Sequence, residues 1–458
     1  MDKKLNYGRT FLIGLAFLSI SSFWQVYDTI IPMMLKNTFG LGETITGVVM
    51  ALDNVLAIFL LPVFGSLSDK VDTKLGKRTP FIITGTVLAV IFLLLLPVAD
   101  KAKNLPLFVG ALFGVLISMG IYRSPAVALM PDLTPNRLRS RANAVINLMG
   151  AVGGVYSLRM IKILGGGTGP RPDYEPLFIS VAAVMVVSVL VLVLTIREKK
   201  IAAQVAAEEA AESIVAGEEA GSTETVAAAQ EADGEDIWEE NSDNREKAEK
   251  KGTVLAPEVK RSMIFMLVSI FLWFTAYNAV TTAFSRYTIE VWKLADNGFA
   301  DCLTVATAAA IISYIPIGQI SSRFGRKKTI MGGVLLMAAC YLFAVFVTEY
   351  TPFINVAFAL IGAAWAAINV NSYPMIVAMS EGADIGKFTG TYYTFSMAAQ
   401  IMTPILSGFL LEHVSYRTLF PYAMIFSLLA FLTMTQVRHG DVKPAKKASL
   451  LENFDVDD

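Results

Sequence analysis

Twelve long apolar blocks constrain this sequence more than any other feature. A helix needs roughly 20 apolar residues to cross a bilayer. Blocks close to that length lie at residues 11–34, 45–67, 81–98, 107–130, 142–163, 178–196, 263–288, 303–320, 329–347, 353–379, 388–411 and 419–437. Since backbone polar groups inside lipid must be satisfied within the chain, these blocks are expected to be helices. The sequence predicts an all-α membrane protein with twelve transmembrane helices.

Charged residues are scarce, and their positions predict the orientation. Only 17% of the 458 residues are charged, against about a quarter in a soluble protein. Basic clusters at residues 70–78, 137–141 and 323–328 all follow even-numbered blocks. Because short cytoplasmic loops are enriched in Lys and Arg, we expect a plasma-membrane protein with both termini in the cytoplasm. The net charge of −1 gives no reason to expect a nucleic-acid partner.

Residues 197–261 interrupt the apolar pattern. They are rich in Ala, Glu, Gly and Ser, and such a composition cannot bury enough apolar surface to fold by itself. We interpret this segment as a flexible acidic cytoplasmic linker. It separates an N-terminal six-helix bundle at 1–196 from a C-terminal six-helix bundle at 262–437, which a cytoplasmic tail at 438–458 follows.

The two halves contain related stretches. FWQVYDT begins at Phe23 and WFTAYNA at Trp273, so that Tyr27 recurs as Tyr277 and Asp28 as Asn278. The loops after the second and eighth blocks also correspond at a similar offset. Parallel six-helix halves are a transporter architecture in which the substrate site lies between the halves near mid-membrane. We therefore predict two pseudo-symmetric bundles around a central site.

The loop after the second block carries a more specific pattern. Gly65-Ser-Leu-Ser-Asp69-Lys70, followed by Gly76-Lys77-Arg78, resembles the signature of the major facilitator superfamily. The longer run at 62–82, together with Ser-Pro-Ala at 124–126 and Asp-Leu-Thr-Pro at 132–135, is similar to the glycoside–pentoside–hexuronide:cation symporters. Within that family the run most resembles the sucrose-transporter-like branch.

This resemblance implies a carrier that works by alternating access, moves sugars and uses H⁺ or Na⁺ as the coupling ion, with no other cofactor. The expected partners are the lipid bilayer and a small-molecule substrate, and the expected state is a monomer. Two positions depart from the family pattern. The acidic pair expected on the second helix is absent at Ala57 and Leu61, and the branch arginine is replaced by Val127, with Arg123 one turn earlier.

Asp28 and Asp53 are the candidate coupling residues. A carboxylate at mid-membrane costs about 3 kcal/mol on insertion scales, so such residues face a cavity or a partner. At 1.5 Å rise per residue, Asp28 lies roughly 28 Å from Arg9 and Asp53 roughly 24 Å from Asp69. Their similar depth predicts neighbouring carboxylates, which cannot both ionise easily in a low dielectric. The alternative is a purely structural hydrogen-bonding role.

Amides and aromatic rings within the blocks are the candidate substrate ligands. Sugar hydroxyls need paired donors and acceptors, and sugar C–H faces pack on rings. Trp24 and Asp28 are four residues apart and share a helix face. The full predicted set is Trp24, Gln25, Asp28, Tyr277, Asn278, Trp365, Asn369, Asn371 and Gln400. Alternatively, amides in membrane helices often only bridge neighbouring helices.

Charged residues near the cytoplasmic helix ends are the candidate gating residues. The set is Asp69, Arg78, Arg123, Asp132, Arg141, Arg323 and Arg326. The resemblance implies a latch of charge pairs that stabilises the outward-open state. In the second half, where Ser322 replaces the acid, this latch is expected to be weaker or absent. Simple anchoring by positive charge is the alternative. Arg123 has three candidate roles: it forms an inner gate, binds an anionic group of the cargo, or is a buried partner for a helix carbonyl.

The sequence leaves several functions open. Gly150, Gly153 and Gly154 are interpreted as close helix packing. The glycine-rich run at 165–169 lacks the Lys-Ser/Thr ending of a phosphate-binding loop, and we expect no enzyme. The favoured function is cation symport of a small polar solute, a sugar or glycoside. The alternatives are an exporter or lipid-type carrier of the same fold, or a transport-inactive membrane sensor or scaffold.

Overall fold

The predicted all-helical membrane fold is confirmed. The computed structural model describes residues 5–135, 138–165, 172–210, 256–294, 297–380 and 385–441. In that part of the chain, 12 helices are long and apolar enough to cross a membrane. They are α1 (Tyr7–Asn37), α2 (Glu43–Lys70), α3 (Thr79–Lys101), α4 (Leu105–Asp132), α5 (Arg139–Leu164), α6 (Glu175–Thr195), α9 (Pro257–Glu290), α10 (Phe299–Phe324), α11 (Arg326–Phe346), α12 (Ile354–Ser380), α13 (Ile385–His413) and α14 (Leu419–Thr435).

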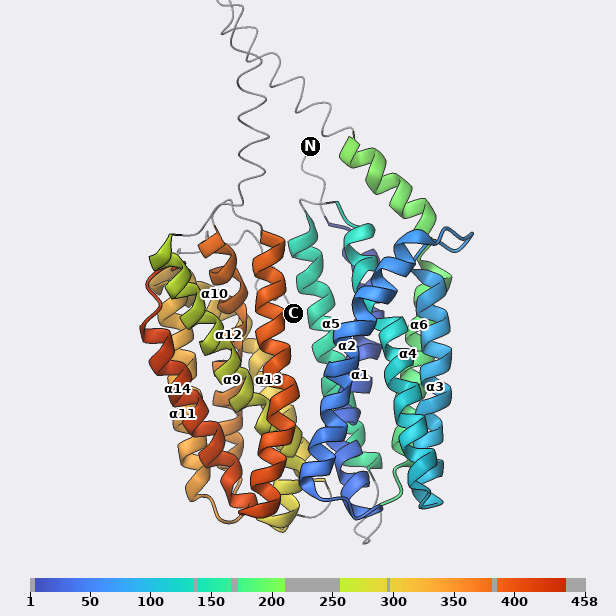
Figure 1. The fold of residues 1–458 in the computed structure, drawn as a ribbon. Helices are drawn as coiled ribbons and strands as arrows, with labels where there is room; N and C mark the ends of the chain where they lie inside the picture. Colours follow the sequence, from blue (N-terminus) through green and yellow to red (C-terminus); the bar gives the residue numbers. More distant parts are fainter. Residues whose placement is uncertain are drawn as a thin grey trace, which may run out of the picture.

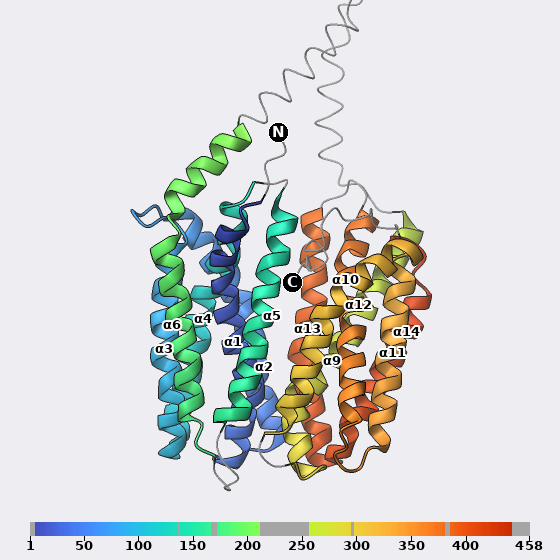
Figure 2. The same cartoon turned by 180° about the vertical axis from the view of Figure 1, so that it is seen from behind.

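The helices form two bundles that stand side by side (Figure 1). Helices α1–α6 form one bundle, where α1 packs on α5 and α3 on α4, and helices α9–α14 form the other, where α12 packs on α10 and α11. Between the bundles, α2 packs against α13, α5 against α10 and α1 against α9. Figure 2 shows the second side of this interface, with α5 next to the C-terminal bundle.

Local sequence signals set the helix ends. The Asn6 side chain accepts a hydrogen bond from the Arg9 amide at 3.0 Å, and the Asn104 side chain accepts one from the Leu107 amide at 3.0 Å. These contacts satisfy amides that have no partner within their own helix. Proline occupies an early position of α3 and α4, where its missing N–H costs nothing.

Large apolar side chains cover the outside of both bundles. Phe59 of α2 is 66% exposed, Ile312 of α10 is 71% exposed and Phe346 of α11 is 76% exposed. Apolar surface on this scale is unusual for a protein surrounded by water, whereas lipid tails would cover it. The chain is a multi-pass membrane protein.

The segment predicted as linker begins as ordered structure. Residues 198–210 form a helix that follows α6 after two non-helical residues, and α9 already starts at Pro257. This helix marks one end of the bundles, at the top of Figure 1, which we call the linker end. The rest of the predicted linker, residues 211–255, and tail residues 442–458 lie outside the described residues.

Candidate functional site

Three adjoining cavities lie where the two bundles meet, and Trp24 of α1 lines all three. We name them by position and lining. The inner chamber, of about 510 Å³, extends towards the linker end. The central chamber, of about 370 Å³, contains the rings of Tyr277 and Trp365. The polar chamber, of about 180 Å³, contains Asp28 and Asp53. The volumes of the inner and central chambers are of the size that small-molecule sites occupy, and the polar chamber is a smaller space that adjoins them.

The polar chamber brings the two predicted coupling carboxylates together. Asp28 comes from α1 and Asp53 from α2, and Arg123 of α4 lines the same chamber. The Asn54 side-chain amide donates a hydrogen bond to Asp53 Oδ1 at 2.7 Å. Within the described ranges, no ion pair shorter than 4.0 Å joins Arg123 to either carboxylate. Asn278 and Gln400, both predicted ligands, complete the polar lining from the C-terminal bundle.

The central chamber contains most of the predicted substrate ligands. Tyr277 of α9 stacks on Trp365 of α12 with ring centroids 3.8 Å apart and planes 6° apart. Gln25 and Asn369 also line this chamber. The two halves therefore both contribute rings and amides to one space, as the internal repeat predicts.

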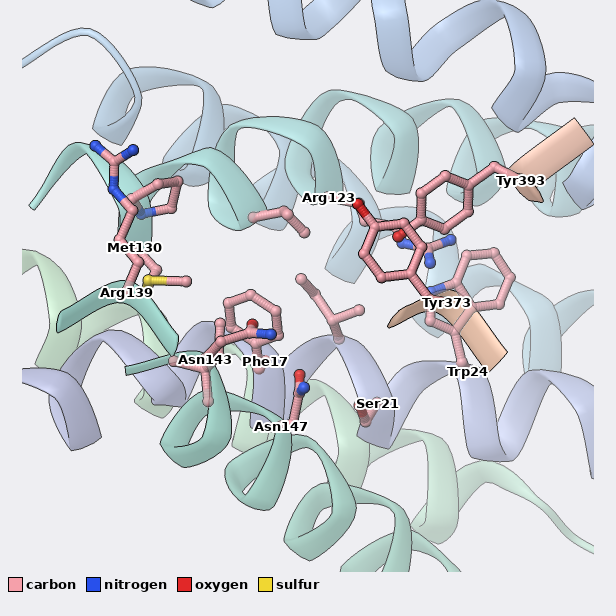
Figure 3. A pocket seen from close by; sticks show the side chains of 14 residues that line it. Phe17, Ser21, Trp24, Arg123, Met130, Arg139, Asn143, Asn147, Tyr373 and Tyr393 are labelled. Atoms are coloured by element: carbon pink, nitrogen blue, oxygen red, sulfur yellow. The ribbon is translucent and has the colours of Figure 1, made fainter. Parts of the chain in front are cut away.

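The inner chamber contains residues that the sequence analysis did not single out. Figure 3 shows Tyr373 and Tyr393 of the C-terminal bundle beside Arg123, with Asn143 and Asn147 of α5 along another side. Asn143 and Asn147 are four residues apart and share a helix face. That spacing of amides within an apolar block was a signal that could have identified them.

Arg123 and Arg139 lie at opposite ends of the inner chamber (Figure 3). The Arg123 guanidinium lies 5.9 Å from the centroid of the Trp24 ring, within the range of a cation–π contact. The Arg139 side chain is 41% exposed and lies 3.9 Å from Glu209 of the linker helix. The chamber thus runs from mid-membrane to an exposed residue at the linker end.

Two donors on the cavity wall have no protein partner. The indole nitrogen of Trp24 and the side-chain amide nitrogen of Asn278 are buried without a hydrogen bond to any described residue. An unsatisfied buried donor costs roughly 1–3 kcal/mol. Acceptor atoms of a bound solute, or water, would remove that cost.

Asn371 departs from its predicted role as a substrate ligand. Its side chain is only 1% exposed and does not line any of the three chambers. It accepts a hydrogen bond from Ser321 of α10 and donates one to the Ala367 carbonyl at 2.8 Å. Asn371 therefore bridges α10 and α12, which is the alternative that the sequence left open for such amides.

At the end opposite the linker, a buried ion pair joins the two bundles. Arg286 Nε of α9 donates to Glu43 Oε2 of α2 at 2.6 Å, and the two side chains are 7% and 3% exposed. Lys36 Nζ of α1 lies 2.6 Å from Glu290 of α9. The Tyr416 hydroxyl donates to the second Glu43 oxygen. We call these five residues the outer cluster.

Further contacts close the same end. Lys162 of α5 lies 3.2 Å from Asp301 of α10, and the Thr44 amide of α2 donates to Glu412 of α13 at 2.7 Å. None of these residues stood out in the sequence, because they lie at block ends, where charged residues are common. Nothing in the sequence of one half indicates which charge of the other half it meets.

Comparison with known proteins identifies the family. The sequence profile of the Major Facilitator Superfamily matches residues 13–312 and 292–453, which together cover most of the chain. The chain belongs to the Major Facilitator Superfamily. Its family and fold are those of transporters, which implies a small-molecule substrate and a membrane environment.

Similarity to individual superfamily members is partial. The chain is 28% identical over 116 residues to chloramphenicol resistance protein CraA of Acinetobacter baumannii, covering 25% of this chain and 28% of that protein. It is 25% identical over 160 residues to sucrose transport protein SUT3 of Oryza sativa, covering 31% of this chain and 30% of that protein. The matched segments thus span under a third of these relatives.

Solved structures of the superfamily share the overall fold. The nucleoside transporter NupG aligns with a TM-score of 0.65 at 16% identity, covering 94% of this chain and 100% of that one. A POT-family peptide transporter aligns with a TM-score of 0.64 at 13% identity, covering 94% of each chain. At these identities the likeness concerns the fold alone.

The predicted superfamily latch forms a compact cluster within the N-terminal bundle. Arg78 Nε donates to Asp132 at 2.8 Å, and its other nitrogens donate to Asp69 and, at 2.5 Å, to Ser68. The Arg78 side chain is 6% exposed. Arg141, also predicted for the latch, lies in the first turn of α5. The cluster ties the ends of α2 and α4 to the start of α3.

The second half has no acid at Ser322, and its two arginines make other contacts. Arg326 donates to the Pro374 carbonyl at 3.2 Å, and the Arg323 guanidinium lies 5.6 Å from the Phe324 ring centroid. A carboxylate reaches this region from further along the chain, since Asp441 accepts a hydrogen bond from the Lys327 amide at 3.0 Å. The second half therefore has an acid at the start of α11, supplied from beyond the sequence motif.

Glu198 plays the equivalent part in the first half. Its carboxylate accepts hydrogen bonds from the amides of Lys77, Arg78 and Thr79 at 2.8, 2.9 and 2.8 Å. These amides open α3, where partial positive charge favours an anion. In both halves, an acid that follows the sixth helix caps the start of the third.

Among the described residues, no group of three His, Cys, Asp or Glu is placed to hold a metal ion.

Proposed function

We propose that this protein is a secondary active transporter that moves a sugar or glycoside by symport with H⁺ or Na⁺. The observation that carries the proposal is the polar chamber, where Asp28 and Asp53 meet Asn278 and Gln400 at the interface of the bundles. The partial similarity to a rice sucrose transport protein supports a sugar as cargo.

The two ends of the interface support alternating access. The outer cluster closes one end with a buried pair, Glu43–Arg286, and a partly exposed pair, Lys36–Glu290. The inner chamber extends to the exposed Arg139 at the other end. With the linker end in the cytoplasm, this arrangement corresponds to an inward-facing state. Breaking the outer cluster would expose the same chambers to the outside.

Coupling requires that ion and cargo change the preference between the two states, not merely that they bind. An uncompensated carboxylate inside the membrane is costly. A cation on the Asp28–Asp53 pair would lower that cost during the change of access. Cargo hydroxyls that bridge these carboxylates to Asn278 and Gln400 would tie cargo binding to the same step, because the four residues come from both bundles.

Transport by purified protein in proteoliposomes tests the proposal. We expect labelled sucrose, maltose or a methyl glucoside to accumulate when an inward H⁺ or Na⁺ gradient is imposed, and to stop accumulating when an ionophore collapses it. Asp28→Asn should abolish the gradient-dependent part. The proposal would be contradicted if every sugar entered liposomes with and without the protein equally, whether or not an ion gradient is present.

A second candidate is drug export, which the similarity to chloramphenicol resistance protein CraA favours. Expression in a chloramphenicol-sensitive bacterium separates the two functions. Increased resistance that Asp28→Asn removes, without sugar uptake in proteoliposomes, would support the exporter. Unchanged resistance together with gradient-driven sugar uptake would support the symporter.

A further inference from the structure

One wall of the central chamber is a rigid aromatic surface. Tyr277 and Trp365 stack at 3.8 Å, and Phe274 contacts Trp365 edge-on at 5.3 Å. Both members of the stack line the chamber. Phe274 packs edge-on against the indole, so this wall consists of aromatic rings that support one another.

The chamber is widened elsewhere by small residues. Gly150 and Gly154 of α5 and Ala306 and Ala310 of α10 line it, and residues four apart on a helix share a face. A Cβ atom added at Gly154 would meet only the Gln25 side-chain oxygen, at 3.7 Å, which is ordinary contact. Larger side chains at these positions would occupy the space beside the aromatic wall.

The adjoining polar chamber has the opposite character. Most of its lining is polar, and Thr281, Thr282 and Gln400 supply uncharged donors and acceptors next to the carboxylates. Trp24 and Asp28 line both chambers, so one ligand can extend from one into the other. The unpartnered donors of Trp24 and Asn278 favour a ligand with acceptor oxygens along this border.

We propose that the preferred cargo is a sugar joined to a planar aromatic ring, either an aryl O-glycoside or a nucleoside. The sugar hydroxyls would lie in the polar chamber, and the ring would lie on the Tyr277–Trp365 wall. This inference rests on the proposed function and specifies its cargo. A free sugar can offer only a C–H face to the aromatic wall, whereas an aromatic ring can stack on it.

A ligand series on the purified wild-type protein tests the ring. Binding of methyl β-glucoside, p-nitrophenyl β-glucoside, uridine and p-nitrophenol is measured by quenching of tryptophan fluorescence and by isothermal titration calorimetry. Because ring stacking adds a contact that the methyl compound lacks, we expect the nitrophenyl glucoside or uridine to bind about tenfold more tightly than methyl β-glucoside. If p-nitrophenyl β-glucoside binds more tightly than uridine, the preferred cargo is an aryl O-glycoside; if uridine binds more tightly, it is a nucleoside.

A pair of variants on one helix tests the location. Ala310→Leu places a branched side chain in the central chamber, and we expect it to reduce the aromatic preference to about twofold or less. Ala308→Leu is the matched control, because Ala308 does not line a chamber and shares its helix face with the exposed Ile312. It should keep the wild-type preference. Thermal melting of both variants checks that they are folded.

Three results would overturn the inference. Equal affinity for methyl and nitrophenyl glucosides would remove the role of the ring, and p-nitrophenol binding as tightly as its glucoside would remove the role of the sugar. Loss of the preference in both leucine variants would place the ring elsewhere. In each case gradient-driven sugar uptake would survive, whereas failure of the proposed function would show as no sugar transport at all.

Discussion

Glu43 and Arg286 form an ion pair at 2.6 Å between two bundles, although they are 243 residues apart in the chain. Both side chains are less than a tenth exposed. A buried pair of this kind is costly to break by removing one partner, because an uncompensated charge remains. The pair therefore shifts the conformational equilibrium towards the state in which the end opposite the linker is closed.

Glu43→Gln should shift the protein towards the outward-facing state. Loss of the Glu43 charge destabilises the state in which this end is closed by about 3 kcal/mol. This corresponds to about a hundredfold change in the ratio of inward-facing to outward-facing molecules. A cysteine introduced at Thr281, in a background without Cys302 and Cys340, should then react faster with a membrane-impermeant thiol reagent added outside. Glu290→Gln is the control, because Glu290 is 39% exposed and exposed pairs contribute little. Equal labelling rates in both variants would contradict this role.

Gly47→Ala should have the same effect through backbone contact. A Cβ atom at Gly47 of α2 would lie 2.0 Å from the Pro404 carbonyl oxygen of α13, so the two helices must separate. Gly110→Ala, where an added Cβ meets nothing within 4 Å, serves as the control. Spin-label distances between the outer ends of α2 and α13 should lengthen only in the first variant. An unchanged distance would show that the helices slide without opening.

Asp53→Asn should separate binding from coupling. The amide keeps the size of the side chain but cannot carry the charge that a coupling cation neutralises. We expect gradient-driven accumulation to fall to the diffusion level, while exchange of labelled for unlabelled sugar stays within about tenfold of wild type. Thr281→Val controls for a change of lining without a change of charge. Full accumulation by both Asp53→Asn and Asp28→Asn would exclude the carboxylate pair as the coupling site.

Arg78→Lys should destabilise the N-terminal bundle. Lysine replaces several directed hydrogen bonds to Asp69, Ser68 and Asp132 by one ammonium group, and the two side chains are not interchangeable at such a site. A loss of about 2 kcal/mol should appear as a lower melting temperature in detergent. Lys77→Arg, at the 39% exposed neighbouring side chain, should leave it unchanged. A melting temperature equal to wild type for Arg78→Lys would show that the cluster is not structural.

Glu198→Gln should weaken the start of α3. The glutamine oxygen can still accept one or two hydrogen bonds, but the favourable charge at the helix start is lost, at a cost of about 1 kcal/mol. Hydrogen exchange should quicken at the amides of Lys77, Arg78 and Thr79. Lys199→Ala removes only the exposed pair with Asp72 and should leave exchange at these amides as it is. Faster exchange in both variants would point to loss of the whole linker helix rather than of the cap.

The outcome at Asn369 and Asn371 shows where sequence reasoning reached its limit. Both amides stand two residues apart in the same apolar block, and both were predicted to contact the substrate. Asn369 lines the central chamber, whereas Asn371 is sealed between α10 and α12. A helix turns by about 100° per residue, so the two point in very different directions. Sequence identifies the polar residue, but the rotation of the helix within the bundle decides its role.

The sequence by itself determined the twelve spans, the division into two related bundles and the polar positions within the membrane. These features follow from local composition, because a lipid-embedded backbone must form helices whatever surrounds it. Only the tertiary structure decided the partners across helices: Glu43 with Arg286, Glu198 at the start of α3, and Asp441 at the start of α11. Each of these contacts depends on how whole helices pack against one another, which no local pattern records.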